Sequence, residues 1–274
     1  MITETKLSDL LASLAASKIV DLEQPRTIGM PCFPTHWPGY NFTLHRRHEP
    51  GIGARTSAAG VIYAGEHVGT HIDAFCHQAW EMEMLGGVKV TADVQTPTGF
   101  NELSVDTIEP IVRRGVLLDV AAKEGGPLEA RRLLTAEELQ GVADAQGTEI
   151  RPGDVLLVRV GWGPRWTEPD VYMDAPGMDR GAAEWAAKKG VFAVGADNMS
   201  WDLPGYTDPV LGTPLPAHVV LLVQNGVHII ENLALEELSA TGAREFVFVC
   251  APLKYVGGTG GAVRPIAIVP SEAE

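Results

Sequence analysis

The side chains best suited to chemistry lie in one short segment, residues 66–78, which reads EHVGTHIDAFCHQ. Imidazole and carboxylate groups are standard ligands for Zn²⁺ and Mn²⁺. The whole chain has only eight histidines, so three of them with an aspartate in eleven residues indicate a metal site rather than a chance cluster. The candidate residues are His67, His71, Asp73 and His77.

The spacing of these residues limits the path of the backbone. On an extended strand His67 and His71 would stand about 13 Å apart, which is too far for one ion. A helix would bring the two histidines together but would turn Asp73 away from them. We therefore expect the chain to curl, with Gly69 permitting the bend and Thr70 hydrogen bonding behind the ligands.

The surrounding sequence indicates the elements that must position this segment. Apolar runs bounded by turn residues predict buried strands at residues 115–120 and 154–160. Thr135 with Glu138 three residues later forms a capping box that begins a helix. Further predicted elements are helices at residues 3–17 and 179–189, an ordered loop at 25–40, bending strands within 57–72, strands at 19–22, 191–195, 246–251 and after 256, and a helix or strand at 218–223. This mixture predicts an α/β fold.

Composition narrows the class of protein. With 274 residues, 45% of them hydrophobic, the chain can bury the core of one large domain spanning residues 1–274, in which residues 1–17 are the N-terminal helix. A formal net charge of −14 argues against a nucleic-acid partner. The N-terminus lacks the apolar core of a signal peptide, and no uncharged run approaches about 18 residues, so we expect neither export nor a membrane span.

The cysteines point to a reducing compartment. Cys32, Cys76 and Cys250 are an odd, widely spaced set, which is a poor disulfide framework. We therefore expect a cytoplasmic protein. Cys76 neighbours His77 but is expected to be a small buried hydrophobe rather than a ligand.

The motif also resembles a known family pattern. HVGTHIDAFCH, at residues 67–77, is similar to the HxGTHxDxPxH motif of the metal-dependent cyclase superfamily, which includes bacterial kynurenine formamidase and isatin hydrolase. Weaker matches follow in the family's order across residues 18–270: IVDLEQPRTIGMPCFP, GDVLLVRVGW, VGADNMSWD, HVVLLVQNGVHIIENL and LKYVGGTGGAVRPIAI. Phe75 replaces the proline of the motif, and the chain is longer than the short formamidases. Both features favour the longer members, which are similar to isatin hydrolase.

The resemblance implies a fold, a cofactor and an assembly. The fold would be the swivelling β/β/α domain of the superfamily, with a mixed sheet and peripheral helices. The cofactor would be a divalent metal, Mn²⁺ or Zn²⁺, and the protein would be a homodimer or homotetramer. By the same resemblance His67, His71 and Asp73 are the metal ligands, and His77 is the acid/base residue.

Residues further along the chain complete the implied site. His218 and Glu231 resemble the pair that forms a second metal position in the formamidases, and in single-metal relatives such residues would line the pocket. Phe33, His36 and Trp37 could wall an aromatic substrate pocket or serve packing alone.

Three other features have structural interpretations. We expect His228 to be a core residue, and Asp197 and Asp202 to shape a turn near the site. The run GGTGGAVR is expected to be a tight turn rather than a phosphate-binding loop, because it lacks the lysine of that motif.

The expected reaction is hydrolysis of a small cyclic or aryl amide. Water on the metal would attack the carbonyl, and His77 would move the proton to the leaving nitrogen. The alternatives are an arylformamidase acting on N-formylkynurenine, a lactone hydrolase, an enzyme of cyclisation or dehydration, and a non-catalytic protein that binds a metal or small ligand.

Overall fold

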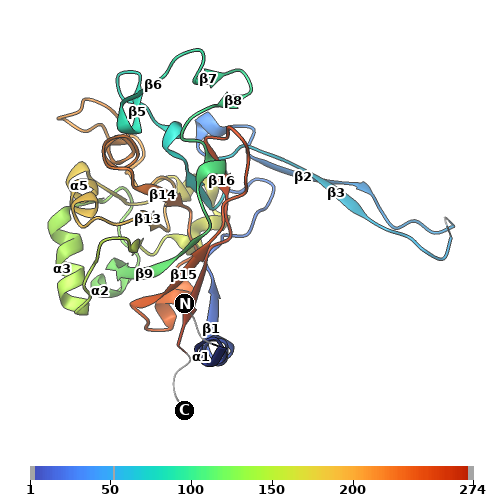
Figure 1. Cartoon of the computed structure of the whole chain (residues 1–274), viewed down its shortest axis with the longest axis horizontal. Coiled ribbons are helices and arrows are strands. Elements are labelled where there is room, and N and C mark those ends of the chain that lie inside the picture. The colour runs from blue at the N-terminus through green and yellow to red at the C-terminus, as the bar shows by residue number, and fades with distance from the viewer. Residues whose placement is uncertain (1–3, 52, 271–274) are drawn as a thin grey trace.

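The architecture is a nine-stranded mixed sheet with helices packed on it (Figure 1). The computed structural model describes residues 4–51 and 53–270. In sheet order the strands are β1 (Lys18–Asp21), β17 (Ile266–Val269), β15 (Glu245–Cys250), β9 (Ile111–Asp119), β11 (Val155–Arg159), β13 (Ala193–Ala196), β14 (His228–Glu231), β4 (His71–Asp73) and β16 (Gly260–Ala262).

The middle of this sheet is parallel and its two sides are antiparallel. Strands β9, β11, β13 and β14 run in one direction, whereas β15, β17 and β1 on one side and β4 and β16 on the other pair antiparallel with their neighbours. Because β1 pairs with β17, the sheet joins the beginning and the end of the described chain.

Helices and small sheets surround this central sheet. The helices are α1 (Glu4–Ala15), α2 (Val120–Glu124), α3 (Ala136–Gln146), α4 (Pro169–Tyr172), α5 (Arg180–Lys188), α6 (Pro216–His218), which runs into a π-helical segment (Val219–Asn225), and α7 (Glu236–Ala240). Single 3₁₀ turns occur at Pro34–His36, Phe75–His77, Leu85–Gly87, Val105–Thr107 and Gly163–Thr167. The two-stranded sheets pair β2 (Tyr40–Arg46) with β3 (Ala59–Ala64), β5 (Glu83–Met84) with β6 (Val88–Lys89), β7 (Gln95–Thr96) with β8 (Gly99–Phe100), and β10 (Leu133–Leu134) with β12 (Gly177–Met178).

The core lies on both faces of the sheet, as β11 illustrates. Leu156 and Val158 point to the face covered by α3 and α5, whereas Leu157 points to the opposite face, which α7 helps to cover. Burial on both faces is why the parallel strands are continuous apolar runs in the sequence. The predicted α/β fold with a mixed sheet and peripheral helices is confirmed.

The ends of α3 and α5 follow from their capping residues. Thr135 Oγ1 accepts a hydrogen bond from the Glu138 amide at 3.3 Å, and Glu138 Oε2 accepts one from the Thr135 amide at 2.8 Å, so the predicted capping box is confirmed. Asp179 caps α5 through the Ala182 amide at 2.7 Å. The helix ends just before Gly190, whose φ is +73°.

Several elements of the first half of the chain differ from the expectations. The bending strands expected within residues 57–72 are two separate strands, β3 and β4, divided by the curl of the motif. Strand β2, which begins at the end of the loop expected at residues 25–40, was not predicted.

The sequence of residues 218–223 is compatible with a helix or a strand. In the structure these residues are helical.

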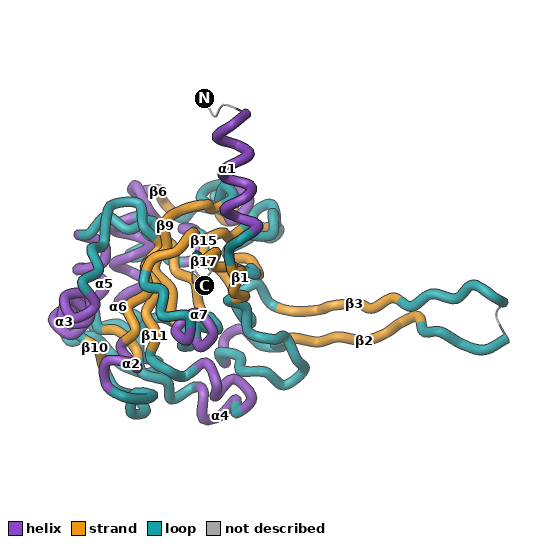
Figure 2. The backbone as a smooth tube through the Cα atoms, turned by 90° about the horizontal axis from the view of Figure 1, so that it is seen from below, coloured by secondary structure: helices purple, strands orange, loops and turns teal. Residues whose placement is uncertain are grey.

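Two elements stand away from the body. The β2–β3 hairpin extends as a long arm, and α1 projects from the body at another point (Figures 1 and 2). Among residues 4–51 and 53–270, no helix is both long and apolar enough to cross a membrane.

Candidate active site

Strand β4 places the central pair of candidate ligands. His71 and Asp73 are two residues apart and therefore project from the same face of the sheet, while Ile72 packs into the core on the other face. In the antiparallel register with β14, Glu231 lies directly opposite His71, and in the register with β16, Gly260 lies opposite Asp73. Sheet pairing therefore brings Glu231 to the metal motif from about 160 residues away in sequence.

The chain curls just before β4, as its spacing requires. Gly69 has a φ of +71°, a conformation that glycine adopts without strain. Its carbonyl accepts hydrogen bonds from His71 Nδ1 at 2.7 Å and Asn232 Nδ2 at 3.0 Å. Thr70 Oγ1 donates to the Asn232 carbonyl at 2.6 Å and accepts from the Gln24 amide at 2.9 Å. Thr70 thus occupies the supporting position that was expected of it.

Arg26 holds the outer side of the same curl. Its guanidinium donates to the carbonyls of Val68 and Thr70, on either side of Gly69, and it forms an ion pair with Glu23 at 2.7 Å. A Cβ at position 69 would lie 2.8 Å from Arg26 Nη1. The site therefore requires glycine here both for its backbone conformation and for the space beside Arg26.

The orientation of His67 is fixed from behind by two residues that the sequence reasoning did not identify. His67 Nε2 donates to Thr259 Oγ1 at 2.8 Å, and the Thr259 hydroxyl donates to Glu66 Oε2 at 2.7 Å. His67 Nδ1 then faces Asp73 Oδ1 at 2.8 Å. Thr259 lies in the run interpreted only as a tight turn, and no spacing pattern links it to His67.

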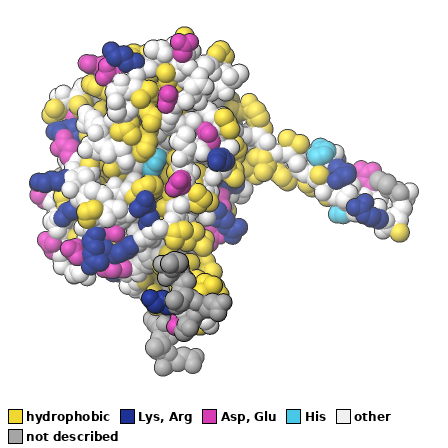
Figure 3. Space-filling model, in the orientation of Figure 1, with side chains coloured by type: hydrophobic (Ala, Val, Ile, Leu, Met, Phe, Trp, Pro, Cys, Tyr) yellow, Lys and Arg dark blue, Asp and Glu magenta, His cyan; other side chains and the backbone are white. Residues whose placement is uncertain are grey.

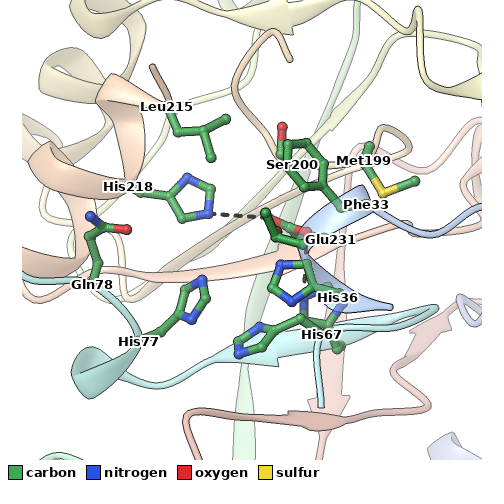
Figure 4. A pocket seen from close by; sticks show the side chains of 12 residues that line it. Phe33, His36, His67, His77, Gln78, Met199, Ser200, Leu215, His218 and Glu231 are labelled. Atoms are coloured by element: carbon green, nitrogen blue, oxygen red, sulfur yellow. Dashed lines mark ion pairs between the residues drawn. The ribbon is translucent and has the colours of Figure 1, made fainter. Parts of the chain in front are cut away.

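His218 and Glu231 also lie close to Asp73 and to each other, and Figure 4 shows the His218 ring directed at Glu231. His218 Nε2 lies 3.6 Å from Asp73 Oδ2 and 3.4 Å from Glu231 Oε1. His71 Nε2 lies 3.4 Å from Glu231 Oε2 and 3.5 Å from Asp73 Oδ1. The structure therefore brings both predicted downstream residues into the cluster.

Asp202 has a more specific role than the turn residue that was expected. Its carboxylate accepts a hydrogen bond from His218 Nδ1 at 2.8 Å and one from the Ala217 amide at 2.7 Å. Because Nδ1 carries the proton, His218 presents Nε2 to the site. The Asp197 carboxylate accepts hydrogen bonds from the backbone amides of residues 160–163, which is the structural role expected for it.

The donor set fits a divalent cation. Asp73 is fully buried, and its Oδ2 has no hydrogen-bond partner among the described residues, which is costly for a carboxylate unless a cation lies beside it. Two sets of potential ligand atoms share Asp73, each with its atoms within 4.8 Å of one another: His67, Asp73 and His77 form one, and His71, Asp73 and Glu231 the other. The predicted ligands are therefore gathered around Asp73, with His67 and His71 in different sets.

Electrostatics favour an ionised Asp73 beside a neutral His77. Burial opposes the charge of Asp73, but the neighbouring His77, His67 and His71 hold its pKa well below its ordinary value. Burial, reinforced by His67 and His218, holds the pKa of His77 well below its ordinary value against the pull of Asp73. A neutral imidazole can accept a proton, which is the state that a general base requires.

A cavity of about 210 Å³ opens above this cluster. Phe33, Met199 and Leu215 provide its apolar wall. The polar lining residues are Thr35, His36, His67, His71, His77, Gln78, Ser200, His218 and Glu231.

The aromatic loop contributes only part of what was predicted for it. Phe33 and His36 line the cavity, and the His36 ring lies 5.0 Å from that of His67. Trp37 does not line it and is 81% exposed, because the 3₁₀ turn ends at His36 and the extended backbone of Trp37 directs its side chain to solvent. The pocket assignment is corrected for Trp37.

The residues behind the site serve packing. His228 donates from Nδ1 to the Asp73 carbonyl at 2.9 Å, and its ring stacks on Phe75 with centroids 4.0 Å apart. Burial lowers the pKa of His228 to about 4 and raises that of the Cys76 thiol to about 12. The structural roles expected for His228 and Cys76 are confirmed.

The fold and the site together define a class. The mixed α/β sheet carries a buried histidine–carboxylate cluster suited to a divalent metal, with a neutral histidine beside it and a small cavity above it. This is the arrangement of a metal-dependent hydrolase. The Cyclase family model, described as "Putative cyclase", matches residues 20–203. The chain belongs to this family.

Individual relatives agree with this membership. Isatin hydrolase of Roseibium aggregatum is 28% identical over 215 residues, which cover 75% of this chain and 73% of that protein. The crystal structure of a novel cyclase superposes with a TM-score of 0.83 at 25% identity, over 97% of this chain and 92% of the other. Isatin hydrolase A from Ralstonia solanacearum gives a TM-score of 0.76 at 25% identity, over 98% and 99% of the two chains.

Proposed function

We propose that the protein is a metal-dependent hydrolase that opens a small cyclic amide of the isatin type. The observation that carries the proposal is the buried Asp73 carboxylate. Its Oδ2 lacks a hydrogen-bond partner among the described residues, and its two oxygens face nitrogens of His67 and His218, which line the cavity. The curated and structural relatives named isatin hydrolase support the substrate class.

The dimensions and lining of the cavity favour a compact, flat substrate. Its volume of about 210 Å³ is below the range of roughly 300–1,000 Å³ that is usual for drug-sized ligands. Phe33, Met199 and Leu215 can contact the face of an aromatic ring. His36 and Ser200 offer polar contacts at the ring's edge.

The metal would be held by His67, His71 and Asp73, with Glu231 and His218 available to a second ion. A bound divalent ion, Mn²⁺ or Zn²⁺, supplies Lewis acidity towards the carbonyl and a water nucleophile at neutral pH.

His77 performs the proton transfers in this proposal. As a neutral imidazole it takes a proton from the attacking water while the carbon–oxygen bond forms. It then returns the proton to the amide nitrogen as the carbon–nitrogen bond breaks. The products of this ring opening are a carboxylate and an amine on one molecule, together with one proton released to solvent, so one water is consumed and no redox partner is needed.

An activity screen with metal analysis tests the substrate class. The metal-loaded protein is assayed with isatin, N-formylkynurenine and a simple lactone, and the bound metal is quantified. We expect the highest kcat/KM on isatin. A preference for N-formylkynurenine would show that the protein is an arylformamidase, and a preference for the lactone would show that it is a lactonase. A metal-loaded protein that is inactive on all three substrates would favour a non-catalytic binding protein.

His77→Ala separates the chemistry from the binding of the metal. The variant should retain its metal but lose about 10²–10⁴-fold in kcat, the usual contribution of a general acid/base. Full activity in this variant would remove His77 from the mechanism.

We also propose that the protein works in a reducing compartment, the cytoplasm, which agrees with its three free cysteines.

A further inference from the structure

Leu215 has a backbone conformation that leucine rarely adopts. Its φ is +53° and its ψ is +54°, in the left-handed region where a Cβ atom is crowded. The next residue is Pro216, and a proline favours an extended backbone at the residue before it. Two separate effects therefore oppose the observed conformation. Such strain persists where the surrounding structure imposes it, and it is concentrated at functional sites.

The surrounding structure holds the chain on both sides of Leu215. Before it, the Asp208 carboxylate accepts hydrogen bonds from the amides of residues 210 and 211, at 3.0 and 2.8 Å respectively. After it, the Asp202 carboxylate accepts one from the Ala217 amide at 2.7 Å. Relaxation of Leu215 to an extended conformation would turn the chain between these two anchored points, so the hydrogen bonds fix the strain in place.

Packing in the core does not account for this conformation. Trp201, with a φ of +55°, is also in the left-handed region, but its side chain is fully buried in the hydrophobic core. Leu215 is only partly buried and is not among the residues that form the core in the described part of the chain. Exposed apolar side chains are common on this protein, as the surface of the body in Figure 3 shows, so partial exposure alone needs no explanation. The strained backbone of a residue outside the core does need one.

The Leu215 side chain lines the cavity above the Asp73 cluster. Figure 4 shows it on one side of the pocket, with Phe33 and Met199 on the other. A flat substrate whose carbonyl reaches the Asp73 cluster would therefore have its ring between these apolar side chains. The cavity measures only about 210 Å³, so the length of each lining side chain limits the size of the ring that fits.

We propose that Leu215 sets the substrate size of this pocket: its side chain, held in the cavity by the left-handed backbone, excludes isatins that carry a substituent on the aromatic ring. The inference rests on the proposed function and narrows its substrate class. In an apolar pocket, a difference of one methylene-sized group changes kcat/KM by about 10–200-fold. Glycine at position 215 would adopt the same conformation without strain, so leucine here exchanges stability for a side chain in the cavity.

The kinetic test compares Leu215→Ala with a control at another strained position. Met82 also has a positive φ, +63°, but it is 62% exposed and is not among the residues that line the cavity. The kcat/KM of each metal-loaded protein is measured on isatin and on its four monobromo derivatives, each substituted at a different position of the aromatic ring. In Leu215→Ala, the kcat/KM on at least one bromoisatin relative to isatin should rise at least about tenfold. Met82→Ala should keep the ratios of the wild type.

A second measurement tests the strain without any substrate. Glycine adopts a positive φ freely, whereas alanine does not, so Leu215→Gly should unfold at a higher urea concentration than Leu215→Ala. This order is the reverse of the one that the two residues give at ordinary backbone positions. Met82→Gly and Met82→Ala should show the same reversed order, because Met82 shares the left-handed conformation.

The two measurements separate the inference from the proposed function. A Leu215→Ala variant that opens isatin and keeps the wild-type ratio for all four bromoisatins would overturn the inference and leave the proposed function intact. A urea midpoint for Leu215→Ala equal to or above that of Leu215→Gly would overturn the strained conformation on which the inference depends. A metal-loaded wild type that does not open isatin would overturn the proposed function, and the inference with it.

Discussion

Asp73 organises the site because its two carboxylate oxygens face different groups. Oδ1 lies near His67 Nδ1 and His71 Nε2, and Oδ2 lies near His218 Nε2. Each of these three histidines uses its other ring nitrogen for a hydrogen bond to the protein, to Thr259, Gly69 and Asp202 respectively. Such supporting contacts fix the tautomer and the direction of each potential ligand.

Thr259 provides a test of this support at the level of one residue. Thr259→Val removes the hydroxyl that links His67 to Glu66 but keeps the shape of the side chain. We expect metal affinity to fall about 10–100-fold, the usual effect of losing such a contact. Thr259→Ser keeps the hydroxyl and should bind nearly as the wild type does. Competition with a chromogenic chelator measures both, and equal affinities for the two variants would contradict the role of Thr259.

The roles of site residues that are close together in the sequence were easier to predict than the roles of residues that only folding brings together. The histidine spacing pointed to a metal site and to the curl at Gly69, because both depend on local geometry. The parts played by Thr259 and Asp202 depend on sheet pairing and on the position of α6, and no local pattern carries that information.

Among the elements, the curl before β4 is the one on which the geometry of the site depends most. Gly69 lies in the turn and bend residues between β3 and β4, and Arg26, Thr70 and Asn232 form hydrogen bonds around it. Without the curl, His67 and the pair on β4 could not face one another.

Gly69→Ala should disturb this element directly. A Cβ there meets Arg26 Nη1 at 2.8 Å, and φ is +71°. We expect a loss of about 1–3 kcal/mol in the free energy of unfolding, together with weaker metal binding. Gly51→Ala, at a positive φ with nothing within 4 Å of its Cβ, is the matched control for backbone strain alone. Chemical denaturation and metal titration compare the two, and equal metal affinity would show that the curl tolerates a side chain.

Elements buried inside the domain were predicted well, whereas the protruding arm was not. Strands β9 and β11 and helices α3 and α5 bear strong local signals, namely apolar runs and capping residues. Strand β2 has an alternating pattern, YNFTLHR, but it follows a loop rich in glycine, proline and aromatic residues. Phe42 and Leu44 of this strand are also exposed in the single chain, so packing against the rest of the chain offered no guide to it.

For the molecule as a whole, the buried His228 couples stability to pH. It lies between Phe75 and Phe192, and its ring is fixed by the Asp73 carbonyl. Burial lowers its pKa from about 6.5 to about 4. The unfolded chain therefore binds a proton on the His228 ring at a higher pH than the folded protein does. The contribution of the neutral, buried His228 to the free energy of unfolding is present above about pH 6.5 and is lost as the pH falls towards 4.

His228→Gln should reduce this dependence on pH. In the wild type, His228 should account for a fall of about 3 kcal/mol in the free energy of unfolding between pH 6.5 and 4. The variant should be less stable at pH 7 but should lose less stability on acidification. Urea unfolding at several pH values and a fixed protein concentration measures this, with exposed His48→Gln as the control. A variant with the wild-type pH slope would contradict the assignment.

The central claim is that a divalent metal at the Asp73 cluster is required to open a cyclic amide, and reconstitution of the metal-free protein tests it most directly. Chelator-treated wild type and Asp73→Asn are titrated with Mn²⁺ and with Zn²⁺ while the hydrolysis of isatin and the bound metal are followed together. We predict no activity in the metal-free protein, recovery in proportion to bound metal in the wild type, and neither tight binding nor recovery in Asp73→Asn. Full isatin hydrolysis by the metal-free protein, or by Asp73→Asn, would contradict the account.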